Sequence, residues 1–183
     1  MKWLSKIASH LRQVYLGLRY RGNAVGYARA IGVRVGKDCK IHANPRKCFS
    51  TEPFLITLGD HVLVTNGVRF LTHDGAGFVL SYQKTNYYDI WGPIRVGNNV
   101  YLGTNALILP SVTIGDNVIV AAGAVVTRDL ASNGVYGGVP ARKIKDFDEY
   151  VRDVKQKAVE NSGLSFAQRK EKYRKLHSEW FES

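Results

Sequence analysis

The chain has 183 residues and a mass of 20.4 kDa, which is enough for one domain with helical extensions and too short for two catalytic domains. Its hydrophobic fraction of 45% and charged fraction of 22% are those of an ordinary globular protein and argue against wholesale disorder. No apolar run approaches the roughly 20 residues of a membrane-spanning helix, and two cysteines, Cys39 and Cys48, are too few for a disulfide framework. Because Lys2, Lys6 and Arg12 interrupt the region where a secretory signal would lie, we expect a cytoplasmic protein.

The net charge of +11 is concentrated in the first 50 residues, which hold eleven Lys and Arg against one acidic residue. The rest of the chain is nearly neutral. A basic segment with interspersed aromatic residues can bind nucleic acid, an anionic membrane surface or an anionic glycan. No pattern of a known nucleic-acid-binding module is present, so we expect no nucleic-acid partner.

Residues 1–30 are predicted to form a basic, amphipathic helical segment in which the first helix ends near Gly22. Its apolar stripe consists of Leu4, Ile7, Ala8, Leu11, Val14, Tyr15 and Leu18. Two interpretations stay open. The stripe packs on the rest of the protein, or residues 1–22 make a peripheral contact with an anionic membrane at the inner membrane face.

A six-residue repeat follows, weakly from Val35 to His73 and clearly from residue 94 to residue 129. In the clear part, aliphatic residues recur at Val96, Leu102, Ile108, Ile114, Val120 and Val126, and a second apolar residue follows four places after each of the first five. Gly, Asn and Asp fill the positions between them. The frame slips by one residue between Ile41 and Leu58, where we expect a bulge or an altered turn.

The period of six fits neither a helix nor a single strand. It predicts a triangular prism in which each hexapeptide supplies one strand and one corner, so that three hexapeptides make a coil of about eighteen residues. The aliphatic residues fill the interior, and Gly, Asn and Asp form the corners. The prism is predicted to span residues 31–145.

Residues 74–93 break the repeat and carry five aromatic residues. A twenty-residue loop that leaves a regular scaffold more often has a function than not. After the prism, residues 146–183 are predicted to form C-terminal helices. Asp146 with Glu149 opens the first, and Ser165 with Gln168 opens a last helix that ends near Trp180.

The hexapeptides "VGNNVY LGTNAL ILPSVT IGDNVI VAAGAV VTRD" and the following "VYGGVPARKI" resemble the hexapeptide-repeat acyltransferases, and among them the sugar and polysaccharide O-acetyltransferases of the maltose and galactoside acetyltransferase type. The resemblance is loose over residues 35–145 and close over residues 94–145. It implies an all-β core folded as a left-handed parallel β-helix, a homotrimer with active sites between subunits, and acetyl-CoA as cosubstrate without a metal. It also implies a sugar or polysaccharide acceptor.

His73 matches the position of the family's catalytic histidine, at a prism corner where the aromatic loop begins. An imidazole can take the proton of an acceptor hydroxyl near neutral pH. Asp74 is expected to orient the ring or to contact the acceptor. His61 lies twelve residues before His73, which places it on a different edge of the prism.

Positions that match the family's cofactor site are Thr104, Ala122, Thr127, Arg128, Arg142 and Lys145. The backbone N–H of Thr104 would donate a hydrogen bond to the thioester oxygen. Backbone groups at Ala122 and Thr127 would hydrogen-bond to the pantetheine arm. Arg128, Arg142 and Lys145 are suited by charge to the phosphates of CoA. The acceptor is expected to meet Asn66 and the loop aromatics, among them Tyr82, Tyr87, Tyr88 and Trp91, although loop aromatics can also pin a loop to its own scaffold.

Three alternatives to a sugar O-acetyltransferase were weighed. An N-acetyltransferase of an amino sugar or antibiotic uses the same scaffold. A non-catalytic prism that binds glycans or membranes would need no acetyl-CoA. A γ-class carbonic anhydrase shares the prism but needs three imidazoles around one zinc, and the sequence offers no such cluster within one subunit.

Overall fold

The computed structural model describes residues 2–83 and 88–181, and the chain divides into two compact units, Met1–Tyr150 and Val151–Ser183. The first unit contains the prism together with the N-terminal helices, which the sequence analysis had set apart as residues 1–30. The second unit contains the C-terminal helical segment.

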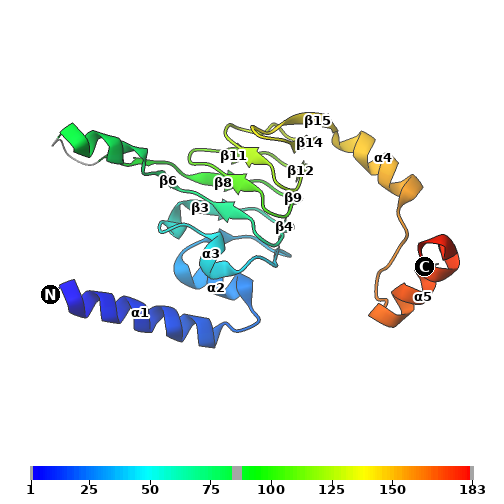
Figure 1. Cartoon of the computed structure of the whole chain (residues 1–183), viewed down its shortest axis with the longest axis horizontal. Helices are drawn as coiled ribbons and strands as arrows, with labels where there is room; N and C mark the ends of the chain where they lie inside the picture. Colours follow the sequence, from blue (N-terminus) through cyan, green and yellow to red (C-terminus); the bar gives the residue numbers. More distant parts are fainter. Residues whose placement is uncertain (1, 84–87, 182–183) are drawn as a thin grey trace. The chain divides into compact units, whose positions relative to one another are not determined.

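Within the described residues, three sheets of short, mostly parallel strands form the faces of a triangular prism, as the repeat predicts (Figure 1). Sheet A consists of β1 (Arg34–Val35), β3 (Ile56–Leu58), β8 (Ile94–Val96) and β11 (Thr113–Ile114). Sheet B consists of β2 (Lys40–Ile41), β4 (Val62–Val64), β9 (Val100–Leu102), β12 (Val118–Val120), β14 (Gly134–Gly137) and β15 (Arg142–Asp146). Sheet C consists of β5 (Arg69–Phe70), β10 (Leu107–Ile108) and β13 (Val125–Val126).

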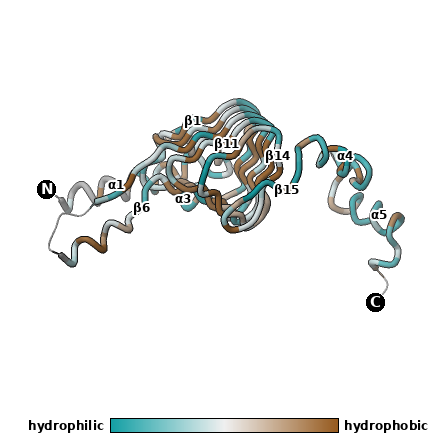
Figure 2. The backbone as a smooth tube through the Cα atoms, turned by 90° about the horizontal axis from the view of Figure 1, so that it is seen from above, coloured by the Kyte–Doolittle hydropathy of each residue, from teal (hydrophilic) through white to brown (hydrophobic). Residues whose placement is uncertain are grey.

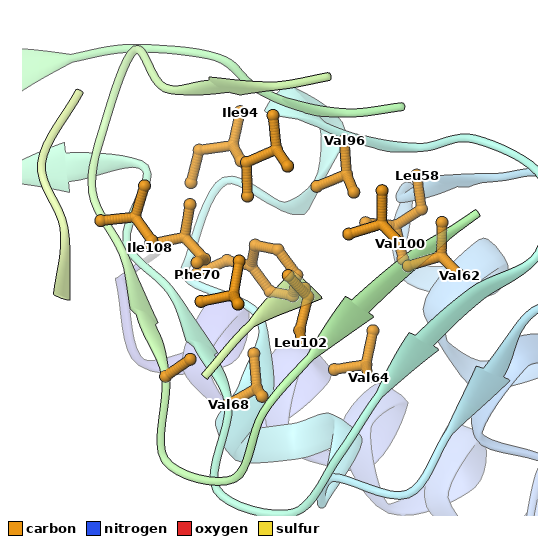
Figure 3. Packing of buried hydrophobic residues seen from close by; sticks show 14 of the residues in the cluster. Leu58, Val62, Val64, Val68, Phe70, Ile94, Val96, Val100, Leu102 and Ile108 are labelled. Atoms are coloured by element: carbon orange, nitrogen blue, oxygen red, sulfur yellow. The ribbon is translucent and has the colours of Figure 1, made fainter. Parts of the chain in front are cut away.

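The interior of the prism is filled by the residues that the repeat singles out. Seen from above, the successive coils lie over one another (Figure 2), and their aliphatic side chains point inward and meet (Figure 3). Each of the six recurring aliphatic residues from Val96 to Val126 is at most 3% exposed. The packing of one aliphatic layer on the next is therefore what holds the coils in register.

The corner between sheets A and B carries a ladder of side-chain hydrogen bonds. Its residues have left-handed backbone angles, with φ between 54° and 61° at His61, Asn99, Asn117 and Asn133. The Nδ2 of Asn99 donates to Oδ1 of Asn117 at 2.8 Å, and Nδ2 of Asn117 donates to Oδ1 of Asn133 at 2.9 Å. His61 begins the ladder, because its Nδ1 lies 3.0 Å from Oδ1 of Asn99. Asparagine suits these corners, since its short polar side chain tolerates left-handed angles.

The N-terminal end of the prism is covered by helices. Helix α1 (Lys2–Arg19) is followed by α2 (Ala24–Ile31), which Asn23 caps by accepting from the backbone N–H of Gly26. The expected frame slip is taken up by two short helical turns, α3 (Pro45–Cys48) and η1 (Pro53–Leu55). These turns replace a regular coil below sheet C, where Phe49 forms an isolated parallel bridge with Phe70.

The C-terminal end of the prism is closed by β15, which the repeat did not predict. It runs antiparallel to β14 within the segment that begins "VYGGVPARKI". Helix α4 (Phe147–Lys157) follows directly. In the second unit, α5 (Phe166–Leu176) starts with the predicted capping box of Ser165 and Gln168, and a turn η3 (Ser178–Trp180) follows it.

Candidate active site

His73 lies where the chain leaves the prism, at the corner between sheets C and A. Its Nδ1 is 2.8 Å from Oε2 of Glu52, a buried side chain on the turn before η1. The same carboxylate accepts hydrogen bonds from the hydroxyl of Thr51, at 2.5 Å, and from that of Thr72, at 2.6 Å. The imidazole is therefore fixed by a partner that is itself held on both oxygens.

The charge of Glu52 determines which nitrogen of His73 can act as a base. Burial acts to raise the pKa of Glu52, but the hydrogen bonds from Thr51, Thr72 and His73 outweigh it and lower the pKa to about 2. An ionised carboxylate only accepts, so Nδ1 of His73 carries a proton and donates it. In the neutral ring, Nε2 then carries the lone pair that a general base needs.

The excursion after His73 forms a two-stranded ribbon. Strand β6 (His73–Asp74) pairs antiparallel with β7 (Ile90–Trp91), and η2 (Ala76–Gln83) lies between them. Trp91 is the direct cross-strand neighbour of His73, so the two side chains emerge on the same face of the ribbon. Tyr88 precedes β7 and is exposed, as is Tyr82; Tyr87 lies outside the described residues.

Asp74 does not hold the histidine ring. Its Oδ1 accepts from the backbone N–H of Ala76 at 2.8 Å, which stabilises the turn into η2. Successive side chains of a strand point to opposite faces, so Asp74 faces away from the side of the ribbon that carries His73. The ring is oriented by Glu52, which the sequence analysis did not single out.

One signal in the sequence points to Glu52. It is the only acidic residue between Asp38 and Asp60, in an otherwise basic stretch. A strict eighteen-residue coil would not place it beside His73, because the two are 21 residues apart. The extra three residues are taken up by the turn η1, Pro53–Leu55, which lies between Glu52 and His73 and which the repeat could not predict.

Asn66, Thr104 and Ala122 lie together on the corner between sheets B and C, and all three are exposed. Their coils are joined by backbone hydrogen bonds, from Asn105 N to Asn66 O and from Gly123 N to Thr104 O. The stack is tight, since a Cβ at Gly103 would lie 2.6 Å from the backbone nitrogen of Ala122. The backbones of successive coils are therefore in close contact at this corner.

The remaining predicted cofactor residues occupy two other places. Thr127 and Arg128 follow β13 on the same corner as His73, two coils further along the prism, and both are exposed. Arg142 and Lys145 lie on β15; Arg142 is exposed, and Lys145 lies 3.4 Å from Glu149.

Within one chain, sheet C separates the corner of His73 from the corner of Thr104 and Ala122. Within one chain the predicted residues therefore lie in three places, the two corners and strand β15, and not in one.

Among the helices that the structure describes, none has the length and apolar character needed to cross a membrane. In the same described part of the chain, no three His, Cys, Asp or Glu side chains gather in a way that could hold a metal ion.

Comparison with known proteins identifies the repeat. The family model described as bacterial transferase hexapeptide (six repeats) matches residues 93–128. Protein CapG of Staphylococcus aureus is 40% identical over 160 residues, which is 87% of this chain and 92% of CapG. Galactoside O-acetyltransferase of Escherichia coli K12 is 34% identical over 110 residues, which is 57% of this chain and only 53% of that enzyme.

Solved structures agree with the fold. A hexapeptide-repeat acetyltransferase of Vibrio cholerae, crystallised with acetyl coenzyme A, gives a TM-score of 0.56 at 32% identity, over 63% of this chain and 61% of that chain. A galactoside acetyltransferase in complex with coenzyme A gives a TM-score of 0.61 over 85% and 87% of the two chains. Its identity of 24% makes it evidence for the fold alone.

The chain belongs to the hexapeptide-repeat transferase family and has the left-handed parallel β-helix that the resemblance implies. More particularly, it is an acetyltransferase of that family, so the expected class of enzyme is confirmed.

Proposed function

We propose that the protein transfers an acetyl group from acetyl-CoA to a hydroxyl of a sugar, in a surface polysaccharide or its precursor. The observation that carries this proposal is the pair of His73 and Glu52, which leaves a basic nitrogen at the rim of an exposed, aromatic ribbon. Acetyl-CoA supplies the acetyl group as an activated thioester.

His73 acts twice on protons. Nε2 takes the proton of the acceptor hydroxyl as its oxygen bonds to the acetyl carbon, and it returns a proton to the sulfur when the carbon–sulfur bond breaks. Glu52 keeps the ring in the required tautomer and stabilises the imidazolium that forms between the two steps. After the two steps His73 has the protonation state with which it began, so one histidine suffices for turnover.

The residues proposed to hold the cofactor fit it chemically. Arg128 and Arg142 present exposed guanidinium groups, which suit the phosphates of CoA, and Lys145 adds a third cation. The corner at Thr104 and Ala122 is exposed, and its coils are closely stacked, which suits an extended pantetheine arm lying along the coils.

A homotrimer would complete the site. One chain holds His73 and Thr104 on different corners, and a neighbouring copy can bring its own Thr104 corner to face the first chain's His73. Exposed apolar residues on the ribbon, such as Phe78 and Ile90, favour contact with another chain.

The acceptor is proposed to bind near the ribbon, with Tyr88 and Trp91 stacking on sugar rings and Asn66 reaching it from a neighbouring copy. The second candidate is N-acetylation of an amino sugar or antibiotic on the same scaffold. A panel of acceptors separates the two, because acetyl transfer is then seen to a hydroxyl or to an amine.

The replacement His73→Ala tests the proposal. We expect kcat to fall by roughly 100-fold or more, the usual contribution of a positioned general base, while acetyl-CoA affinity and oligomeric state stay unchanged. Steady-state kinetics and equilibrium binding of acetyl-CoA measure both quantities. Near wild-type turnover in this variant would remove His73 from the mechanism.

The basic N-terminal helix is proposed to place the enzyme at the inner membrane face. Apart from Leu16, the described residues of the apolar stripe and its neighbours are exposed, so they do not pack on the prism of the same chain. An anionic lipid surface suits such a helix, since no acidic residue accompanies its lysines and arginines.

A further inference from the structure

The prism has a large cavity at its N-terminal end that the proposed chemistry does not yet use. It has a volume of 1120 Å³ and lies between α1, α2, α3 and the first strand of sheet C, β5. His73 is part of its wall. Ligand pockets of drug-sized molecules measure about 300–1,000 Å³, so this cavity can hold more than one sugar ring.

The walls of the cavity are positively charged. Arg12, Arg46, Lys47 and Arg69 line it, and no acidic residue is among its described lining residues. None of these four cations is within ion-pair distance of a carboxylate in the part of the chain that the structure describes. Their charges are therefore available to a ligand.

One of these cations links the helix layer to the prism. Arg46, on α3, extends to α1 so closely that a Cβ at Gly17 would overlap its guanidinium group. Glycine at this position lets the basic side chain pass along the helix. The cavity is thus bounded on one side by α1 and on the other by β5, with Arg69 on the strand itself.

The position of the cavity relative to His73 separates it from the proposed cofactor site. In sheet C the order of strands is β13, β10 and β5, so the coils that carry Thr104, Ala122 and Thr127 lie towards the C-terminal end of the prism. The cavity lies at the other end, below β5, and His73 lies between the two regions. In a direct transfer the acceptor must reach Nε2 from a side that the thioester does not occupy.

We infer that this cavity binds the part of the acceptor that carries a negatively charged group, recognised by Lys47 and Arg69, while the sugar hydroxyl to be acetylated reaches His73 beside the ribbon. The inference rests on the proposed function. The shared chemistry is an oxyanion a short distance from the acetylated sugar, either the diphosphate of a nucleotide-linked sugar or the carboxylate of a uronic acid. The exposed ring of Phe54 in the cavity wall supplies an apolar face for a neighbouring sugar ring.

Equilibrium binding of acceptor-like probes to the full chain tests the proposed anionic acceptor site without requiring turnover. The probes are UDP-N-acetylglucosamine, trigalacturonate and the neutral maltotriose, each titrated calorimetrically at low ionic strength in the presence and absence of saturating CoA. We expect at least one of the two anionic probes to bind more tightly than maltotriose and to keep its affinity when CoA is present. Binding of UDP-N-acetylglucosamine alone would indicate the diphosphate as the source of the charge, and binding of trigalacturonate alone would indicate the carboxylate.

The double variant Lys47→Gln/Arg69→Gln assigns the binding to the cavity. Loss of two charge-assisted hydrogen bonds is expected to raise the dissociation constant of the anionic probe by about tenfold or more. Arg95→Gln is the matched control, because Arg95 is exposed on β8 and is not part of the cavity wall, and it is expected to leave the affinity within about twofold. Thermal unfolding verifies that the variants are folded.

Three results would overturn the inference: equal binding of the neutral probe, an unchanged dissociation constant in the double variant, or displacement of the anionic probe by CoA, which would assign the cations to the cofactor. Failure of the proposed function looks different. In that case acetyl-CoA itself does not bind to the wild type, or His73→Ala does not slow its use, whatever the anionic probes do.

Discussion

Glu52 and His73 form the most informative contact in the molecule, since the carboxylate is buried, ionised and bonded to three donors. A carboxylate held this firmly fixes the direction of the imidazole independently of the ribbon that follows it. It also links the chemistry of the site to the stability of the fold.

The replacement Glu52→Gln tests that link through pH. The folded-state pKa of about 2 lies below the ordinary value of 4.5, so the ionised side chain stabilises the fold above about pH 4.5. This contribution is lost as the pH falls from 4.5 towards 2. We expect the melting temperature of the wild type to fall more steeply over this range than that of the variant, measured by circular dichroism.

An exposed carboxylate provides the control. Asp89→Asn changes a side chain at the surface of the ribbon and is expected to leave the slope of melting temperature against pH as in the wild type. If the Glu52→Gln and wild-type curves run parallel, the carboxylate does not carry this part of the stability.

Arg142→Ala tests the cofactor site. We expect the KM for acetyl-CoA to rise by about tenfold with little change in kcat, because the phosphates are bound alike in the ground state and the transition state. Lys143→Ala is the matched control, since adjacent side chains of β15 point to opposite faces and Lys143 pairs with Asp146. A KM that is the same in all three proteins would mean that the phosphates lie elsewhere.

At the scale of the element, α1 shows two different faces. Leu16 is buried, whereas Leu11 and Leu18 are 61% and 69% exposed. The amphipathic pattern therefore predicted the helix correctly, but it could not tell which surface the stripe would meet. A stripe is equally compatible with a protein core and with a lipid surface.

Cosedimentation with lipid vesicles shows whether the exposed stripe of α1 meets a lipid surface or another part of the protein. We expect the full chain to bind anionic vesicles, to bind neutral vesicles weakly, and to release the anionic ones as salt is raised, since each basic residue near the surface contributes about 1 kcal/mol. Deletion of residues 1–22 should remove this binding. A folded, active enzyme that does not sediment with anionic vesicles at low salt would exclude the membrane contact.

At the scale of the whole molecule, stability is shared among coils that repeat the same interactions. The asparagine ladder is the clearest example, because Asn117 both accepts from Asn99 and donates to Asn133 while its backbone is left-handed. An alanine at this position loses the hydrogen bonds and strains the backbone. A glycine loses only the hydrogen bonds.

The pair Asn117→Ala and Asn117→Gly separates these two effects. Left-handed backbone costs about 1–2 kcal/mol for an ordinary residue, so we expect alanine to destabilise the protein by about 1 kcal/mol more than glycine, the reverse of their order in a helix. Urea unfolding followed by circular dichroism measures the difference. If the alanine variant is the more stable of the two, the corner does not require a left-handed residue.

The prism was predictable because each hexapeptide specifies its own geometry: an aliphatic residue at the first position and a corner former such as Asn117 determine a coil locally. The end structures were not predictable in this way. The turns α3 and η1 interrupt the repeat, so the six-residue period does not predict them. The contact between Glu52 and His73 depends on η1, which lies between the two residues in the chain. His73 could therefore be singled out as a candidate, because its corner position follows from the repeat, whereas Glu52 could not.

The direction of β15 also determines how the prism terminates. Every coil of a parallel β-helix presents the same row of backbone donors and acceptors to the next, so an uncovered last coil would be a template on which another molecule could continue the stack. Strand β15 occupies the edge of β14 in the opposite direction, and residues 138–141 hydrogen-bond to β13 beside it. The antiparallel strand β15 thus prevents the β-helix from continuing into a filament of stacked molecules.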